Sequence, residues 1–119
     1  MTVIKQDDLI QSIADALQFI SYYHPTDFIR AMRGAWEREE SPAAKAALTQ
    51  VLVNSRMCAI GKRPICQDTG IVNVLISVGM DVQWDADMAF EDMINEGVRR
   101  GYTNPDNVLR GSVLTDPNG

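Results

Sequence analysis

The chain changes character across the stretch Ile65-Cys66-Gln67-Asp68-Thr69-Gly70-Ile71-Val72-Asn73-Val74-Leu75-Ile76-Ser77-Val78-Gly79, residues 65–79. Its first part places a thiol, an amide, a carboxylate and a hydroxyl on four adjacent residues. Its second part is rich in β-branched residues and too short for an average helix, which favours a β-strand over residues 71–79. We therefore expect a polar loop held by a strand, with one face of that strand formed by Val72, Val74, Ile76 and Val78.

Three helices are predicted before this loop. The first covers about residues 7–23 and ends before a proline, because the residue preceding proline is pushed out of the helical region. The second begins at a cap on Thr26 or Asp27. The third follows the Ser41-Pro42 pair, a serine cap with proline at the first helical position, and runs to about Ala59. Their expected buried faces are Leu9, Ile13, Leu17 and Ile20; Phe28, Met32, Ala35 and Trp36; and Ala44, Ala47, Leu48, Val51 and Leu52.

A fourth helix is predicted after the strand. Asp85 or Asp87 can cap it, and a short turn starts at Asn104-Pro105. The sequence thus indicates an α+β fold, mainly α-helical, in a single domain over residues 1–119. The strand lacks an obvious partner, so pairing must come from Val113-Leu114 or from outside the chain. The buried face expected for the fourth helix is formed by Phe90, Ile94, Gly97 and Val98.

Composition sets aside several functions. With 119 residues and a net charge of -5, the chain is a poor candidate for gripping a nucleic-acid backbone, which requires a clustered basic face. No apolar run approaches the roughly 20 residues of a membrane span. Residues 1–11 do not resemble a secretory signal, so we expect a cytoplasmic protein with reduced thiols.

The two cysteines, Cys58 and Cys66, are separated by seven residues, a spacing that matches no common zinc or redox pair. For Cys58 the simplest interpretation is a small buried hydrophobe. Cys66 lies in the polar loop, which could equally be an ordinary turn in which Asp68 and Thr69 bond their own backbone. A nucleophilic thiolate needs a nearby base, and the single histidine, His24, is more simply interpreted as a turn residue.

The loop, the segment after it and Asn107-Val108-Leu109-Arg110-Gly111-Ser112 together resemble class I fumarate hydratases. These are iron–sulfur hydro-lyases, a group that includes the tartrate dehydratase α subunits. The similarity covers essentially the whole chain, with its predicted elements in the family's order. Family members are several times longer, so we expect this chain to correspond to the beginning of their N-terminal region. The unpaired strand and the terminal run Asp116-Pro117-Asn118-Gly119 agree with that expectation.

The resemblance implies specific roles. Cys66 matches the first of three cysteines that hold a 4Fe–4S cluster, and thiolate is a suitable ligand for such a cluster. Gln67 and Asp68 match positions beside the cluster, where the amide would bind a substrate carboxylate and Asp68 would contribute both to binding and to catalysis. Arg110 matches a residue that binds a small dicarboxylate substrate, for which a planar guanidinium is well suited.

The resemblance also implies what the chain lacks. A cluster of this type needs three cysteines, and only Cys66 occupies a ligand position. We therefore expect the chain alone to be inactive and to require the remainder of the enzyme or a β subunit. We expect the complete enzyme to be a homodimer. Tartrate or methylfumarate as substrate stays open, as does a non-catalytic helical module that binds a partner through an unpaired strand. A thiol redox protein is disfavoured by the absence of a Cys-x-x-Cys pair.

Overall fold

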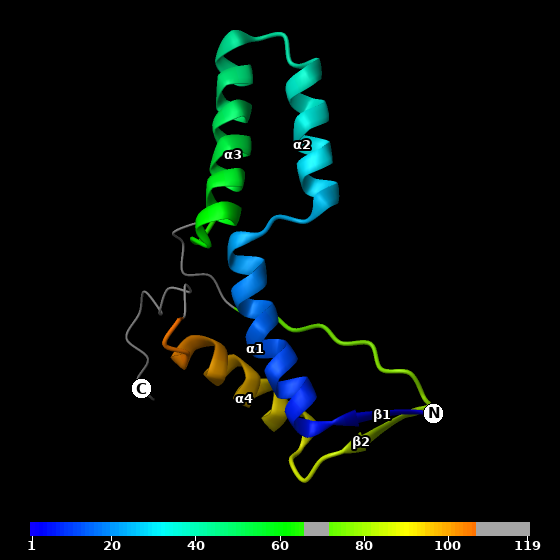
Figure 1. Ribbon diagram of the computed structural model, residues 1–119. Coiled ribbons are helices and arrows are strands. Elements are labelled where there is room, and N and C mark those ends of the chain that lie inside the picture. The colour runs from blue at the N-terminus through cyan, green and yellow to red at the C-terminus, as the bar shows by residue number, and fades with distance from the viewer. Residues whose placement is uncertain (66–71, 107–119) are drawn as a thin grey trace. The chain divides into compact units, whose positions relative to one another are not determined.

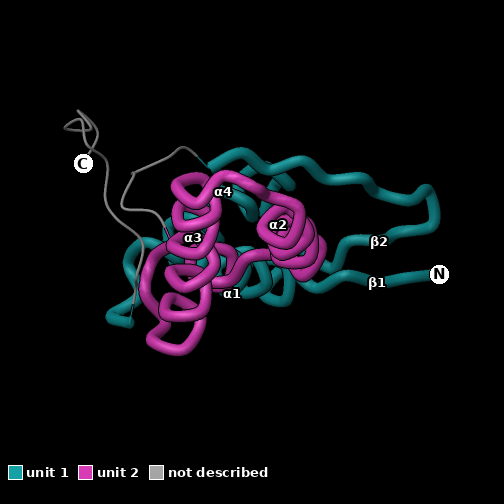
Figure 2. Tube along the Cα trace, turned by 90° about the horizontal axis from the view of Figure 1, so that it is seen from above, with its two compact units in different colours: residues 1–18, 68–119 teal, residues 19–67 magenta. Residues whose placement is uncertain are grey.

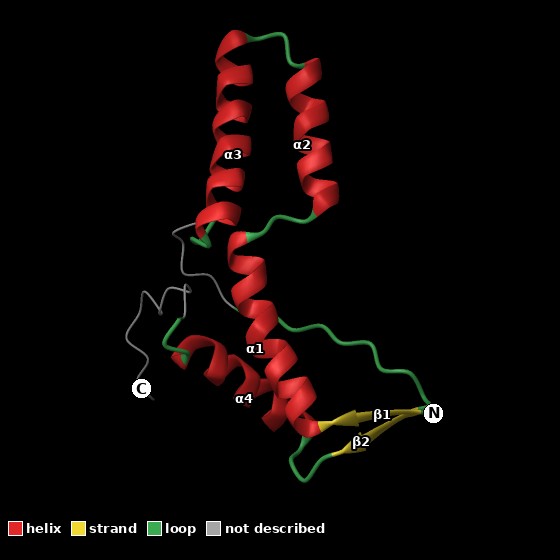
Figure 3. Ribbon diagram, viewed as in Figure 1, coloured by secondary structure: helices red, strands yellow, loops and turns green. Residues whose placement is uncertain are grey.

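The computed structural model describes residues 1–65 and 72–106. The fold is α+β and mainly helical, as the sequence predicts (Figures 1 and 3). Within the described ranges, no helix is both long and apolar enough to cross a membrane. The elements in chain order are β1 (Thr2–Lys5), α1 (Gln6–Tyr22), α2 (Thr26–Arg38), α3 (Pro42–Gly61), β2 (Val82–Asp85) and α4 (Phe90–Thr103).

The chain separates into two compact units, coloured differently in Figure 2. Unit 1 comprises residues 1–18 and 68–119, and unit 2 comprises residues 19–67. The boundary falls within α1, so the last turn of that helix is assigned to unit 2. The single domain expected over residues 1–119 stays a prediction.

The core of unit 1 lies where α1 meets α4. Ile10 and Met93 are almost completely buried there, at 1% exposure each. Two glycines of α4 allow the helices to approach closely: a Cβ on Gly97 would lie 2.7 Å from the Cβ of Ile13, and one on Gly101 would lie 3.1 Å from a methyl of Leu17. The Gln18 amide also donates a 2.8 Å hydrogen bond to the carbonyl of Gly101. Small residues at the crossing therefore decide how these helices pack.

A two-stranded sheet completes the described part of unit 1. β1 and β2 pair in parallel, with Thr2 opposite Val82 and Lys5 opposite Asp85 (Figure 3). The Gln6 side chain accepts hydrogen bonds from the backbone amides of residues 87 and 88, at 3.0 and 3.2 Å. These bonds tie the start of α1 to the segment that leads into α4.

The strand predicted over residues 71–79 was placed wrongly. Residues 72–79 are assigned to neither helix nor strand, and the strand of this region is β2, a few residues later. Its partner is β1, at the start of the chain, where we predicted no strand. Val113-Leu114, the alternative partner, lies outside the described residues. Apolar alternation shows which residues can form a strand, whereas pairing requires a backbone partner alongside, and at residues 82–85 that partner is β1.

Unit 2 contains the helical hairpin of α2 and α3, which lie side by side in Figures 1 and 2. Trp36 of α2 links the helices: its indole N–H donates a 2.8 Å hydrogen bond to the Thr49 hydroxyl. The Lys45 ammonium lies 4.2 Å from the centre of the same ring, a cation–π contact. Every side chain of α2 is at least partly exposed, and Trp36 makes both a hydrogen bond and a cation–π contact with α3.

Of the three helices for which an N-cap was predicted, one has the predicted cap. Ser41 caps α3 as predicted, and its hydroxyl accepts a hydrogen bond from the Ala44 amide. For α2 the predicted caps, Thr26 and Asp27, are wrong, because the N-cap position belongs to Pro25. The caps predicted for α4, Asp85 and Asp87, are likewise wrong, because Ala89 holds that position.

The predicted buried faces are partly correct. Leu17 and Gly97 are buried, but in α1 the other buried residues are Ile10 and Ala14, and Ile20 is 63% exposed. The reason is that the buried stripe follows the neighbour that a helix meets: within unit 1, Ile13, Ala14 and Leu17 of α1 lie against the glycines of α4. In α3 the buried residues are Ser55 and Cys58, whereas the predicted core residues Ala47 and Val51 are exposed. Phe28 and Phe90 are each 37% exposed.

On the surface of α4, one glutamate pairs with two arginines, and the stability that these ion pairs contribute depends on pH. Glu96 accepts hydrogen bonds from Arg99 and Arg100, at 2.6–2.7 Å and 3.1 Å, and these bonds lower its pKa from 4.5 to about 2. Since the folded pKa is depressed, the stabilisation is complete above pH 4.5 and is lost as pH falls through about 2. We expect a carboxyl NMR titration to give a Glu96 pKa near 2 at low salt. A pKa near 4.5 would mean that the pair does not persist in solution.

Candidate functional site

The four predicted site residues lie outside the described part of the chain. Cys66, Gln67 and Asp68 belong to the loop and Arg110 to the C-terminal segment. Their roles as metal ligand, substrate-binding groups and catalytic carboxylate therefore stay predictions. The structure does describe the residues that lead into the loop, all of which belong to unit 2.

The C-terminal end of α3 turns the chain sharply toward the loop. Lys62 adopts the left-handed conformation, with φ 50° and ψ 52°, directly after the last helical residue, Gly61. The carbonyl of Cys58 accepts hydrogen bonds from the backbone amides of both Lys62 and Arg63, the latter at 3.1 Å. This left-handed cap satisfies a carbonyl that the helix would otherwise leave unpaired. The direction in which residues 64 and 65 leave α3 is thereby set by the backbone.

The next two residues are attached to both neighbouring helix ends. The thiol of Cys58 lies 3.4 Å from the carbonyl oxygen of Pro64, and the amide of Ile65 donates a 2.8 Å hydrogen bond to the carbonyl of Ser21 in the last turn of α1. Cys58 is 5% exposed, which confirms the prediction that it is a small buried residue. Its thiol also lies 3.6 Å from the Asn54 side-chain oxygen. The chain thus enters the candidate loop from a fixed position.

His24 occupies the turn between α1 and α2, as predicted. Its ring Nδ1 lies 2.9 Å from the hydroxyl of Ser55, and its ring stacks on Phe28 with centroids 4.4 Å apart. Ser55 is 6% exposed, and a buried hydroxyl needs such a hydrogen-bond partner. The contacts of His24 are therefore those of a residue that joins α2 to α3.

The described residues do not form a metal centre by themselves. Within residues 1–65 and 72–106, no group of three or more His, Cys, Asp or Glu side chains could hold a metal ion. The Cys58 thiol is buried between Asn54 and the Pro64 carbonyl, so it is not presented as a ligand. These residues therefore do not fit an iron–sulfur cluster by themselves, and Cys66 is the cysteine left as a candidate ligand.

The structure adds supporting residues that the sequence analysis missed. Ser21 and Ser55 were given no role, yet Ser21 holds the lead-in to the loop and Ser55 binds His24. A signal for Ser55 was available: it follows Leu48 and Leu52 at helical spacing, so it shares their face of α3. No comparable signal marks Ser21, since its contribution is a backbone carbonyl, which every residue possesses.

Comparison with known proteins identifies the family. The model of the fumarate hydratase (Fumerase) family matches residues 10–118. A protein of Methanocaldococcus jannaschii, assigned as an L(+)-tartrate dehydratase subunit alpha, is 26% identical over 88 residues, which cover 74% of this chain and 31% of that protein. The chain thus spans about a third of the length of the curated relative that it matches. Because the family match extends over nearly all its residues, this chain belongs to the fumarate hydratase family.

Proposed function

We propose that this chain is the N-terminal part of a hydro-lyase that reversibly adds water to fumarate to give malate. The observation that carries the proposal is the family match over residues 10–118, which includes the Cys66-Gln67-Asp68-Thr69-Gly70 segment. Loops anchored at helix ends are common positions for functional groups. The anchoring of Pro64 and Ile65 supports such a role for the segment that follows.

In this proposal Cys66 is one ligand of a 4Fe–4S cluster. When bound, the cluster would supply a Lewis acid for the hydroxyl and a carboxylate of malate. The other protein ligands come from outside this chain, because Cys58 is buried and engaged. The chain by itself is therefore inactive and acts together with the rest of the enzyme or with a β subunit.

The chain's own polar residues bind and orient the substrate. Arg110 pairs with one carboxylate of the dicarboxylate through its planar guanidinium, and the Gln67 amide donates a hydrogen bond to the other. Asp68 orients the hydroxyl of malate, or the water that adds to fumarate, and takes part in proton movement, for which a positioned carboxylate is suitable. We place this reaction in the cytoplasm and the complete enzyme in a homodimer.

A second substrate has specific support. The relative from Methanocaldococcus jannaschii is named for L(+)-tartrate, and fumarate and tartrate are both four-carbon dicarboxylates. The guanidinium of Arg110 would serve either substrate equally well, because it recognises the carboxylate that they share. Dehydration of L-tartrate is therefore the alternative proposal, with methylfumarate as a related one.

The test uses the complete protein that carries this chain, purified and reconstituted with iron and sulfide without oxygen. We expect bound iron, the absorption of a 4Fe–4S cluster, and hydration of fumarate followed at its ultraviolet absorbance. Faster turnover of L-tartrate than of fumarate or malate would select the alternative substrate. Failure to bind iron, together with no turnover of any of these dicarboxylates, would contradict the proposal and favour a non-catalytic partner-binding module.

A further inference from the structure

One exposed face of α3, here called its outer face, carries an uncharged seam at heptad spacing. Successive seam residues are four and then three positions apart in the sequence, which is the spacing by which one helix packs on another. All five are exposed, and the three large hydrophobic ones, at positions 53, 57 and 60, are 51%, 65% and 74% exposed. The seam consists of Ala46, Gln50, Val53, Met57 and Ile60.

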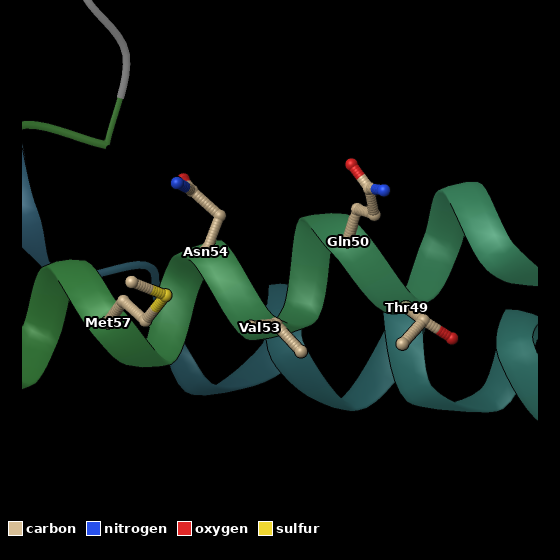
Figure 4. A pocket seen from close by; sticks show the side chains of 5 residues that line it. All are labelled: Thr49, Gln50, Val53, Asn54 and Met57. Atoms are coloured by element: carbon tan, nitrogen blue, oxygen red, sulfur yellow. The ribbon is translucent and has the colours of Figure 1, made fainter.

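The seam is also slightly hollowed. A shallow depression of about 370 Å³ on α3 is lined by Thr49, Gln50, Val53, Asn54 and Met57 (Figure 4). In Figure 4 the side chains of Gln50 and Asn54 rise on one side of the helix, and those of Val53 and Thr49 point to the other. A shallow, elongated depression with an apolar floor suits a helix better than a small molecule, which requires an enclosed cavity.

Charge favours an acidic occupant. α3 contains no acidic residue, and Arg56 beside the seam is exposed. Lys62 and Arg63 follow directly at its C-terminal end, both exposed. Residues 19–67 contain seven Lys and Arg against four Asp and Glu, whereas the rest of the chain has four against twelve. The seam therefore lies on the basic unit of an acidic protein.

We propose that the outer face of α3 binds an acidic amphipathic helix of a partner chain. The apolar side of that helix packs on the seam, and its carboxylates face Arg56 and the basic C-terminal end of α3. A second copy of α3 fits this chemistry less well, because it would bring a helix with no acidic residue against another of the same kind. This inference goes beyond the proposed hydro-lyase activity and stands on unit 2 alone.

The test measures binding of a designed peptide to the whole chain by fluorescence anisotropy. The probe is an acidic peptide of about three heptads, with leucine at the two seam positions of each heptad and glutamate at the flanking positions. Its matched control carries lysine in place of each glutamate. We expect the glutamate peptide to bind at least about tenfold more tightly than the lysine peptide. Equal binding of both peptides, or binding of neither, would overturn the proposal.

Two substitutions locate the peptide on the seam. Met57→Glu places a like charge in the seam and is expected to weaken binding of the glutamate peptide at least about tenfold. Arg56→Glu is expected to raise the affinity for the lysine peptide relative to the affinity for the glutamate peptide. Leu75→Glu is the matched control, since Leu75 is a 98% exposed apolar residue outside α3. Helix content, measured by circular dichroism, should be equal in all three variants, because each site is exposed.

Self-association is measured in the same samples by sedimentation velocity. We expect no dimer that depends on the seam. A dimer of the unliganded chain that Met57→Glu dissociates and Leu75→Glu does not would identify a second copy as the occupant and overturn the proposal. Unchanged binding of the glutamate peptide by the Met57→Glu variant would also overturn the proposal. Neither result would contradict the hydro-lyase proposal, which rests on the family match and is tested by iron content and turnover.

Discussion

Cys66→Ala, made in the complete protein, is expected to lose both cluster binding and fumarate hydration. The physical reason is that thiolate is a strong ligand for iron whereas a methyl group cannot bind it. Loss of a residue that merely supports a metal ligand typically costs 10- to 100-fold in affinity or activity, so removing the ligand should reduce turnover by more than ~100-fold. Iron content, visible absorption and hydration rate after anaerobic reconstitution measure the effect.

Cys58→Ala is the matched control for this experiment. It removes the other thiol of the chain, which is buried and contacts Asn54 and Pro64. We expect this variant to keep its iron and its hydration rate, with a small loss of stability from the vacated space. If Cys66→Ala retains cluster and activity, or if Cys58→Ala loses the cluster while remaining folded, the assignment of Cys66 as a ligand is wrong. The loop would then be interpreted as a turn.

Gly97→Ala is expected to destabilise unit 1 by ~1–3 kcal/mol in free energy of unfolding, the usual cost of overpacking. The new methyl would lie 2.7 Å from the Cβ of Ile13 and 2.9 Å from the backbone carbonyl oxygen of Ile10. Backbone atoms cannot move aside as a flexible side chain can, so α1 and α4 must separate. Gly97→Val should cost more, because its larger side chain enlarges the clash. Urea unfolding of the whole chain measures both changes.

Gly34→Ala separates this clash from the intrinsic effect of removing a helical glycine. Gly34 lies in α2, where a methyl would meet only the Arg38 guanidinium, at 3.0 Å, and that side chain can move. Alanine is favoured over glycine inside a helix by roughly 0.5–1 kcal/mol, so Gly34→Ala should be neutral or stabilising. A Gly97→Ala variant as stable as Gly34→Ala would contradict the close packing of α1 on α4.

The helices are the part of the fold that could be predicted from the sequence. Residues 7–23, predicted as the first helix, differ from α1 by one residue at each end. The serine and proline that begin α3 act within one turn of the helix, so their effect could be predicted without knowledge of any neighbour. The turn at Asn104 is equally local, since its side chain accepts a 2.8 Å hydrogen bond from the Asp106 amide.

The errors concern residues whose structure depends on distant parts of the chain. The segment 72–79 has the apolar alternation of a strand, yet β2 forms at residues 82–85, where β1 lies alongside. Ile20 has the helical spacing of a core residue but is 63% exposed. Periodicity identifies the residues that could be buried, and the neighbour decides which of them are.

For the candidate site, the sequence indicates which chemical groups are present, and the structure shows how Pro64 and Ile65, which precede them, are held. The thiol, amide and carboxylate of residues 66–68 and the guanidinium of Arg110 are visible in the sequence, and their proposed roles depend on the family to which the chain belongs. Tertiary structure confirmed the predicted burial of Cys58, and it alone shows that the Cys58 thiol contacts the carbonyl of Pro64.

The amino-acid sequence by itself determined the mainly helical character, the extent of α1 to within one residue at each end and the start of α3 at Ser41-Pro42. These features follow from interactions within a few residues, such as caps, proline restrictions and helical periodicity. Tertiary structure alone decided the pairing of β1 with β2, the close approach at Gly97 and the exposure of the α3 seam. These depend on contacts between residues far apart in the chain, and no local pattern specifies which distant surface a residue will meet.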